Sequence, residues 1–270
     1  MFENLSIPLP PLSEQQKIAG VLSAIQEAKE KTENVIKATK ELKKSMMKHL
    51  FTYGPVLPAE DTGKVPLKET EIGIIPEHWE VVKLGEIAKQ RKESIIPSGH
   101  EKSRYIGLEH IHTGEIKAKK HGFDNEVRST KYKFYKGDIL YGKLRPYLDK
   151  CVLVDFDGIC STDIVVIANS KKVKMNYLVN LMHRYELIKY ATQSMTGVNH
   201  PRTSWKALSI FKIALPPLFE QQQIADILSA IDNKIEAEEG KKQALDTLFK
   251  TLLSLLMTGK IRVKRFGGVK

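Results

Sequence analysis

One segment of the sequence occurs twice. Residues 7–25 read IPLPPLSEQQKIAGVLSAI, and residues 213–231 read IALPPLFEQQQIADILSAI. At an offset of 206 residues, 14 of these 19 positions are identical, and the register continues far enough to align Leu50 with Leu256. A repeat array would show several copies at a short period. Two copies around about 150 unrelated residues instead indicate two equivalent structural supports around one domain.

Each copy predicts a long helix. The prolines at its start fix an extended approach, because proline cannot occupy a helix interior. Ser13 is a good N-cap and Gln16 completes a capping-box pattern, whereas Phe219 replaces the serine in the second copy. Each helix then continues for roughly 38 residues, about 57 Å, to a glycine in the stop position. The expected spacer helices are residues 13–53 and 216–258.

Both helices carry a narrow apolar stripe, which is typical of a coiled coil. The first helix leads into the middle segment and the second leads out of it, so a pair formed by them must be antiparallel. The stripe weakens at Glu238 and Lys242, and in the first helix its middle drifts to Val35. Two surface helices packed on a globular core remain the alternative. The predicted interface residues are Ile18, Leu22, Ile25, Leu42, Met46, Leu50, Ile224, Leu228, Ile231, Ile235, Leu245, Leu252 and Leu256.

Residues 66–215 predict a mixed α and β domain. Residues 176–192 have an apolar face at helical spacing, which predicts one helix. The expected fold class is therefore α+β, with one globular mixed α/β domain flanked by two long helices in an antiparallel coiled coil. Strands bounded by turn signals are expected at residues 104–108, 133–135, 138–141, 151–154 and 164–167.

Composition excludes several classes of protein. The 270 residues are 41% hydrophobic and 28% charged, enough to form a buried core in a soluble protein. No apolar run is long enough to cross a bilayer, and the N-terminus lacks a signal-peptide pattern. The two cysteines, Cys151 and Cys160, are too few for a disulfide scaffold and fit a reducing compartment. We therefore expect a cytoplasmic protein without membrane association.

The net charge of +11 is concentrated in the middle of the chain. Residues 64–215 hold 26 Lys and Arg against 17 Asp and Glu, whereas the two flanks together hold 17 against 15. A basic block of this kind indicates a polyanionic partner such as nucleic acid.

No complete catalytic or metal-binding motif is present. The glycine patterns that cradle phosphates or dinucleotides are absent, as are methyltransferase signatures. His110, His112 and His121 lack a further ligand at metal-binding spacing. The string from Glu115 to Lys117 imitates the end of a nuclease motif, but such strings are frequent in a lysine-rich chain. We expect a binding component that is not an enzyme and holds no metal.

Three segments combine groups for phosphate contacts with groups for base edges, as sequence-specific DNA binding requires. Arginine suits guanine and asparagine suits adenine. The alternative for each segment is a solvated surface loop. The predicted DNA-binding residues are Lys143, Arg145, Tyr147, Lys150, Thr196, Asn199, His200, Arg202, Ser204, Lys117, Lys119 and Lys120.

Together these features resemble the specificity (S) subunit of type I restriction–modification enzymes. The resemblance rests on the doubled helix opening and on residues 75–79 (IPEHW), 136–140 (KGDIL), 161–163 (STD) and 256–263 (LMTGKIRV). It implies a subunit without chemistry of its own, whose target recognition domains each read one half of a bipartite site in double-stranded DNA. It also implies docking to methylation subunits and, through the complex, to restriction subunits. S-adenosylmethionine, ATP and Mg would belong to those partners, and no cofactor is expected in this chain.

One feature departs from the family pattern of domain, helix, domain, helix. This chain has the order helix, domain, helix, and residues 1–12 resemble the end of a missing recognition domain. We expect two copies to form a homodimer through their helices and to read an interrupted palindrome. The alternatives are a stand-alone nuclease or methyltransferase, a scaffold that does not bind DNA, and a fragment that needs a second specificity chain. The remaining expected segments are a linker at residues 54–65 and a tail at residues 259–270.

Overall fold

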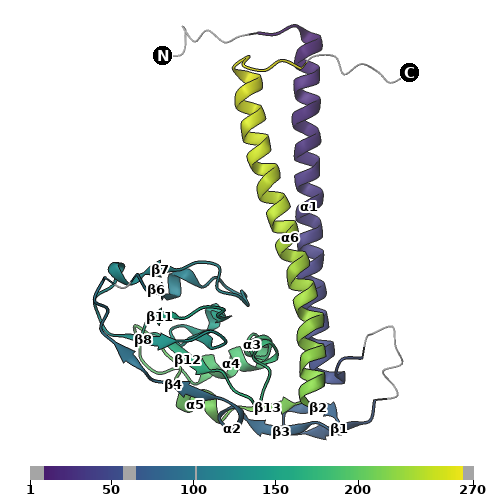
Figure 1. The fold of residues 1–270 in the computed structure, drawn as a ribbon. Helices are drawn as coiled ribbons and strands as arrows, with labels where there is room; N and C mark the ends of the chain where they lie inside the picture. The colour runs from purple at the N-terminus through teal and green to yellow at the C-terminus, as the bar shows by residue number, and fades with distance from the viewer. Residues whose placement is uncertain (1–8, 57–64, 101, 264–270) are drawn as a thin grey trace. The chain divides into compact units, whose positions relative to one another are not determined.

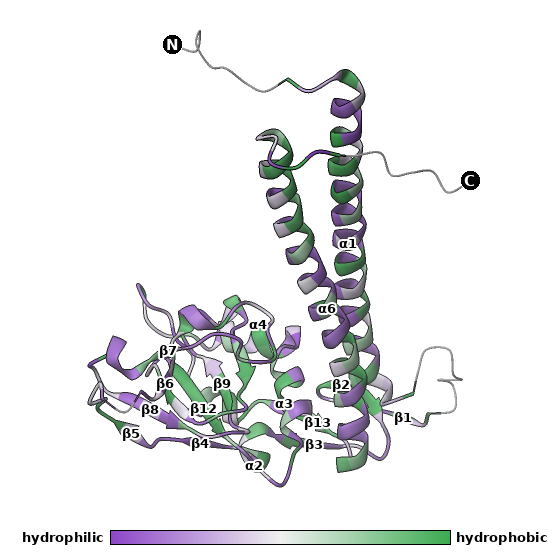
Figure 2. Cartoon of the chain, turned by 45° about the horizontal axis from the view of Figure 1, so that its top comes forward, coloured by the Kyte–Doolittle hydropathy of each residue, from purple (hydrophilic) through white to green (hydrophobic). Residues whose placement is uncertain are grey.

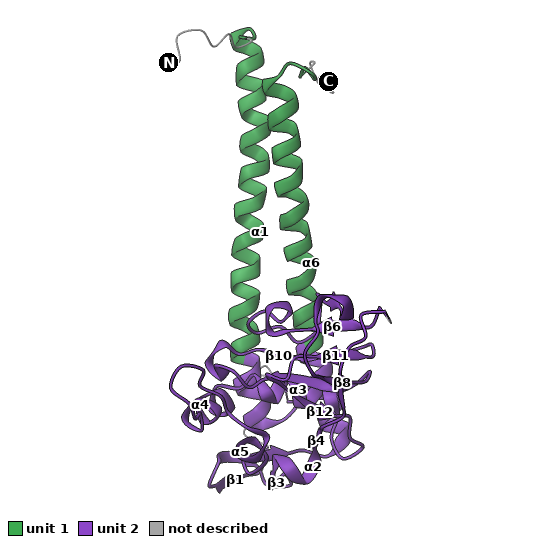
Figure 3. Ribbon diagram, turned by 90° about the vertical axis from the view of Figure 1, so that its left-hand side faces the viewer, with its two compact units in different colours: residues 1–45, 229–270 green, residues 46–228 purple. Residues whose placement is uncertain are grey.

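A computed structural model describes residues 9–56, 65–100 and 102–263. The chain divides into two compact units (Figure 3). One unit contains the chain up to Ser45 and from Ser229 onward, and the other spans Met46–Leu228. The division falls inside the two long helices and not at the expected domain limits of 66 and 215. Each unit is described by itself below.

The two longest elements are α1, Leu12–Tyr53, and α6, Leu218–Met257, with 42 and 40 residues (Figure 1). Lys29 pairs with Asp246 at 2.5 Å, and Lys43 pairs with Asp232 at 2.6 Å. From the first pair to the second, the residue number rises by fourteen along α1 and falls by fourteen along α6. The helices are antiparallel, which confirms the expected fold class.

Both helices begin with the same hydrogen-bond pattern, which differs from the predicted serine cap. The Pro11 carbonyl accepts from the amides of Glu14 and Gln15 at 2.8 and 3.0 Å, so Ser13 lies inside α1. The Gln15 side chain instead donates to the Pro10 carbonyl at 2.8 Å. The proline carbonyls and the glutamine amide therefore satisfy the helix start, and the second copy needs no serine.

The seam between the helices keeps a 3–4 heptad spacing throughout, unlike the drift expected for the first helix. Ile36 is 8% exposed, whereas Val35 and Leu42 are 41% and 51% exposed. Leu42 was wrongly expected in this seam. The seam positions on either side of it are the polar residues Thr39 and Lys43, so apolar character does not mark the seam here. Figure 2 shows the mixed hydropathy along both helices. The buried or half-buried seam positions are Ile18, Leu22, Ile25, Lys29, Thr32, Ile36, Thr39, Lys43, Met46 and Leu50 on α1, and Ile224, Leu228, Ile231, Ile235, Glu238, Lys242, Leu245, Phe249, Leu252 and Leu256 on α6.

In the described part of the unit spanning Met46–Leu228 there are two larger sheets and two strand pairs. Their strand orders are β10-β9-β12-β4, β5-β8-β11-β6-β7, β1-β2 and β13-β3. Among these strands, every pairing is antiparallel except that of β11 with β6. The strands are β1 Leu67–Thr70, β2 Gly73–Pro76, β3 Glu80–Lys83, β4 Lys89–Arg91, β5 Ser94–Ile95, β6 Arg104–Ile106, β7 Gly122–Phe123, β8 Lys131–Phe134, β9 Ile139–Gly142, β10 Cys151–Leu153, β11 Gly158–Cys160, β12 Ile164–Ala168 and β13 Lys212–Leu215.

The core of this unit lies between the two larger sheets. Apolar side chains from β6, β8 and β11 meet side chains from β9, β10 and β12, and removal of their apolar surface from water stabilises the sandwich. The cluster is Ile106, Ile111, Phe134, Leu140, Val152, Val154, Cys160, Ile164 and Val166.

The buried carboxylate of Asp138 links the KGDIL segment, residues 136–140, to neighbouring strands and loops. This side chain accepts from Arg91 Nε at 2.9 Å and from the amides of Tyr135 and Asn169 at 2.9 and 2.8 Å. Gly137 precedes it with φ +88°, and a Cβ there would lie 2.8 Å from Asn169 Nδ2. Only glycine fits this turn without strain, so the segment is structural.

The expected helix over residues 176–192 is two helices. The break falls at His183, whose ring contacts Asp149 Oδ1 at 2.7 Å and the Cys151 carbonyl at 2.9 Å. Contacts with a distant loop therefore set this corner, and helical periodicity carries no sign of them. The shorter helices are α2 Leu84–Ile87, α3 Met175–Met182, α4 Tyr185–Gln193, α5 Trp205–Ser209 and the 3-10 turns η2 Leu108–His110, η3 Asp124–Glu126 and η4 Pro146–Leu148.

Some expected segments lie wholly or partly outside the described residues. They include most of the expected domain remnant at residues 1–12, most of the linker and much of the tail. The second-copy counterpart of that remnant contains β13, which pairs with β3. Among the described residues, no helix is both long and apolar enough to span a membrane.

Candidate nucleic-acid interface

The loops that contain the predicted DNA-binding residues are joined by hydrogen bonds, the first through Thr113, which lies before the predicted cluster of Lys117, Lys119 and Lys120. Residues 112–120, 143–150 and 196–204 are called here the three-loop surface. Thr113 Oγ1 donates to the Leu148 carbonyl at 2.9 Å, which joins the first loop to the second. The amides of Arg145 and Thr203 donate to the carbonyls of Pro201 and Lys143, both at 3.0 Å, which joins the second loop to the third. The middle loop is therefore held on both sides.

The third loop is held in place by the ion pair between Arg202 and Asp163. Arg202 Nε donates to Asp163 Oδ1 at 2.7 Å, and Arg202 Nη1 donates to the His200 carbonyl at 3.0 Å. The Arg202 hydrogen bond holds the pKa of the Asp163 carboxyl below its usual value. The Arg202 amide also donates to the Thr196 carbonyl, and the Thr196 amide donates to the Arg202 carbonyl, both at 3.0 Å. These bonds make residues 196–202 a closed loop with a defined tip.

The second loop contains two residues with left-handed backbone. Arg145 and Asp149 both have φ +50° and flank η4. Few residues other than glycine adopt this region, and those that do concentrate at functional sites. The His183 ring anchors Asp149 from the corner between α3 and α4. The strained geometry places the exposed Arg145 and the half-exposed Tyr147 on the outer side of the loop.

Several predicted DNA-binding residues are exposed, whereas the side chains of others form hydrogen bonds within the domain. Lys150 Nζ donates to the Leu108 carbonyl at 2.6 Å. Ser204 Oγ caps α5 by accepting from the Ala207 amide at 3.2 Å, and Arg202 binds Asp163. These three side chains support the surface. The exposed predicted residues are Lys117, Lys119, Lys120, Arg145, Tyr147, Thr196, Asn199 and His200, and Lys143 is half-buried.

Sequence reasoning missed residues that complete this surface. Val198 is 96% exposed at the tip of the third loop, and an apolar side chain there offers contact to a thymine methyl group. Asp163 and His183 hold the loops from inside the domain. The signal for Asp163 was present in the STD segment, whereas nothing local marked His183.

Two features of the described residues bear on catalysis. Cys151 and Cys160 are buried, and burial raises the pKa of both thiols, which disfavours the reactive thiolate. No group of three or more His, Cys, Asp or Glu side chains in the described ranges could hold a metal ion.

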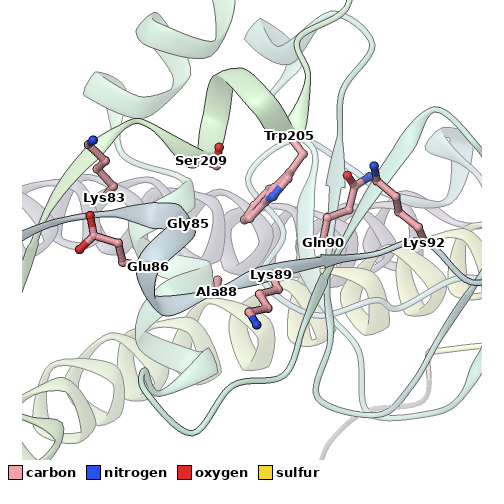
Figure 4. Close-up of a pocket in the computed structure, with 9 residues that line it drawn as sticks. All are labelled: Lys83, Gly85, Glu86, Ala88, Lys89, Gln90, Lys92, Trp205 and Ser209. Carbon is pink, nitrogen blue, oxygen red and sulfur yellow. The ribbon is translucent and has the colours of Figure 1, made fainter.

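A separate open groove of about 450 Å³ lies between α2, β4 and α5 (Figure 4). It is lined by lysines, by Glu86 and by the Trp205 ring. Lys89 in this groove is exposed and belongs to none of the three loops.

The chain thus has a mixed α/β domain with a basic loop surface and two long paired helices. Residues 1–42 and 76–247 match the family model described as the type I restriction modification DNA specificity domain. The chain belongs to this type I restriction–modification specificity family.

Its relatives are longer than the chain. The MjaVIII specificity subunit of Methanocaldococcus jannaschii is 32% identical over 279 residues, which cover 98% of this chain and 64% of the relative. The EcoDI specificity subunit of Escherichia coli is 25% identical over 280 residues, which cover 96% and 63%. The chain thus spans less than two thirds of the length of these relatives.

Solved structures share the fold. The HsdS subunit from Thermoanaerobacter tengcongensis superposes with a TM-score of 0.53 at 19% identity, over 94% of this chain and 60% of that one. The type I system S subunit from M. genitalium gives a TM-score of 0.59 at 18% identity, over 92% and 61%. At these identities the likeness concerns the fold alone.

Proposed function

We propose that the chain is the DNA sequence-specificity subunit of a type I restriction–modification system. Its recognition domain, residues 66–215, reads one half of a bipartite site in double-stranded DNA. The observation that carries this proposal is the hydrogen-bonded contact between the three loops, which gathers basic and polar side chains from distant parts of the sequence. Family membership supports the same function.

The exposed side chains suggest a division of labour on the DNA. Lys117 and Lys120 have no side-chain hydrogen bond or ion pair within the described residues and suit phosphate contacts. Arg145 and Asn199 suit base edges, because each forms bidentate pairs with a purine. Tyr147 adds an exposed ring beside them.

We propose that this subunit contributes recognition without catalysis. Family membership supports this proposal. Methylation subunits would dock on it and supply S-adenosylmethionine, and restriction subunits of the same cytoplasmic complex would supply ATP and Mg chemistry.

We also propose that a second copy supplies the second recognition domain. The interhelical ion pairs of Glu33, Lys40, Asp232 and Asp246 mark one flank of the helix pair. The opposite flank carries apolar residues at heptad spacing, and two lysines on α6 interrupt them. Two copies joined along this flank would bury side chains that are exposed or half-buried in one copy. The apolar positions are Val21, Ala28, Val35 and Leu42 on α1 and Ile227, Leu248 and Leu255 on α6.

Binding of the purified chain to a random DNA pool, followed by sequencing, tests the recognition role. Arg145→Ala should weaken binding to the selected site by about 1–3 kcal/mol, roughly 5- to 150-fold. Lys89→Ala removes an exposed lysine outside the three-loop surface and is the matched control. A scaffold that does not bind DNA would show no steep dependence of affinity on salt, and that result would overturn the proposal.

The adenine-methylation pattern in cells that co-express the chain with its neighbouring methylation subunit tests the homodimer. An interrupted palindrome that Leu42→Glu abolishes supports two identical recognition domains. An asymmetric motif would mean that a second specificity chain supplies the other half, which is the competing assembly.

A further inference from the structure

The ring of His183 faces two hydrogen-bond acceptors. Its Nδ1 lies 2.7 Å from Asp149 Oδ1, and its Nε2 lies 2.9 Å from the Cys151 carbonyl oxygen. A backbone carbonyl and an ionised carboxylate can only accept. A neutral imidazole carries one N–H and satisfies one of these acceptors, whereas an imidazolium donates to both. The two contacts together therefore fit the protonated ring.

The surroundings of this ring suit a positive charge that is paired. The His183 side chain is 6% exposed and the Asp149 side chain is 20% exposed. A charge removed from water needs an opposite charge and hydrogen bonds in place of the water. The Asp149 carboxylate provides both on one side of the ring, and the Cys151 carbonyl accepts on the other side.

Other titratable and charged groups near the pair stay neutral or are bound elsewhere. Burial raises the pKa of the Cys151 thiol and of the Tyr141 hydroxyl, so neither ionises near neutral pH. The Arg184 guanidinium, next in the chain to the ring, pairs with Glu186 at 3.2 Å. Lys150 Nζ, next to the carboxylate in the chain, donates to a backbone carbonyl. The aspartate is therefore the ionised group in direct contact with the ring.

Asp149 connects the ring to two of the three loops. It lies in the second loop with φ +50°. Its amide donates to the Pro146 carbonyl, and its own carbonyl accepts from the Gly114 amide of the first loop, both at 3.0 Å. His183 thus holds the residue at which the two loops are joined, and the exposed Arg145 belongs to the same turn.

We propose that His183 is a positively charged positioning residue for the DNA-reading loop of residues 143–150, and that the chain binds DNA best while the ring holds its second proton. Loss of that proton leaves a nitrogen lone pair facing one of the two acceptors, which costs a hydrogen bond. It also leaves the Asp149 carboxylate uncompensated on a surface that approaches phosphates. The inference rests on the proposed DNA-recognition function, because it concerns the regulation of the same surface.

Asp149→Asn separates the effect of the proton from the shape of the loop. The asparagine amide can donate to Nδ1 of a neutral ring whose Nε2–H still donates to the Cys151 carbonyl, so this variant needs no second proton. Asparagine, like aspartate, is among the residues that adopt left-handed backbone. Asp155→Asn is the matched control, because it removes an exposed carboxylate of the same domain outside the three loops.

The measurement is the affinity of the purified full chain for its selected DNA site, at constant salt and at two pH values, about 6 and about 8.5. As the pH rises, the wild type and Asp155→Asn should each lose about tenfold more affinity than Asp149→Asn loses. At the lower pH the wild type and Asp149→Asn should bind equally. The exposed His112 and His200 are present in all three proteins, so their titration cancels in the comparison.

Nuclear magnetic resonance of isotope-labelled histidines reports the proton directly in the wild-type chain without DNA. Both ring nitrogens of His183 should carry protons at the lower pH, and the signal that is lost in His183→Gln identifies this ring. A bare ring nitrogen at the lower pH would overturn the inference. So would an affinity ratio between Asp149→Asn and the wild type that is the same at both pH values.

A failure of the proposed function would look different. If the wild-type chain bound DNA at neither pH, the recognition role would be overturned, and the resonance experiment would still decide whether His183 is charged. If the chain bound DNA with no difference between the pH profiles of wild type and Asp149→Asn, the recognition role would stand and the role of His183 would be overturned.

Discussion

The two-sheet core and the helix seam fill their interiors by different rules. Every member of the core cluster between the sheets is apolar and nearly inaccessible. The seam places Thr32, at 2% exposure, and Glu238, at 9%, at its centre, and Lys234 and Lys241 form ion pairs with Glu238. Apolar burial supplies more stability than a polar seam does, whereas polar seam positions restrict the register in which helices can pair. We infer that the domain is built for stability and the helix pair for a fixed register.

The largest effect should come from the core. Phe134→Ala removes a fully buried ring between the sheets and should lower the free energy of unfolding by about 3–5 kcal/mol. Chemical unfolding followed by tryptophan fluorescence measures this, because Trp79 and Trp205 both lie in the unit that holds the core. Phe219→Ala, at a position that is 64% exposed, should change it by less than about 0.5 kcal/mol. Equal losses in the two variants would contradict the contrast between core and surface.

A smaller loss is expected in the seam. Ile36→Ala should destabilise the helix pair by about 2 kcal/mol, the low end for a buried isoleucine, because its partially polar neighbourhood already limits apolar packing. Lys37→Ala is the control on the adjacent, exposed position, which lies outside both the seam and the proposed homodimer flank, and should cost less than about 0.5 kcal/mol. Far-ultraviolet circular dichroism during unfolding reports the helices. An equal loss in Lys37→Ala would contradict the placement of Ile36 in the seam.

The smallest effect concerns acid. The Lys29 hydrogen bond lowers the pKa of Asp246 in the folded protein. The stabilising contribution of this pair is therefore complete above the unfolded pKa of about 3.9 and is lost as the pH falls through the lowered folded value. Helix unfolding followed from neutral pH to about 3 should show this loss, and Asp246→Asn should lack that part of it. Asp226→Asn, at an exposed position of α6, should retain it. An identical pH profile in wild type and Asp246→Asn would show that the Lys29–Asp246 pair does not stabilise the helix pair.

The DNA-binding role of the loops stays a prediction, but the structure shows what several of their side chains bind. The segments were named from charge and polar content, and hydrogen bonds join the loops that contain them, the first through Thr113 and not through its predicted lysines. Arg202, Lys150 and Ser204 proved to be structural because their side chains bind Asp163, the Leu108 carbonyl and the Ala207 amide. Charge and polarity show that a side chain can bind a phosphate or a base. They do not show whether a partner within the protein has already taken it.

The sequence by itself determined the long antiparallel helices and the mixed domain between them. The repeat, the prolines and the apolar periodicity are local signals, and local geometry follows from them whatever the surroundings. Only the tertiary structure decided that Ile36 and not Leu42 lies in the seam, and that His183 ends α3. It also decided that Glu220 accepts from Trp79 whereas Glu14 accepts from Arg262. Nearly identical segments acquired different environments because burial depends on what the rest of the chain brings to each helix end.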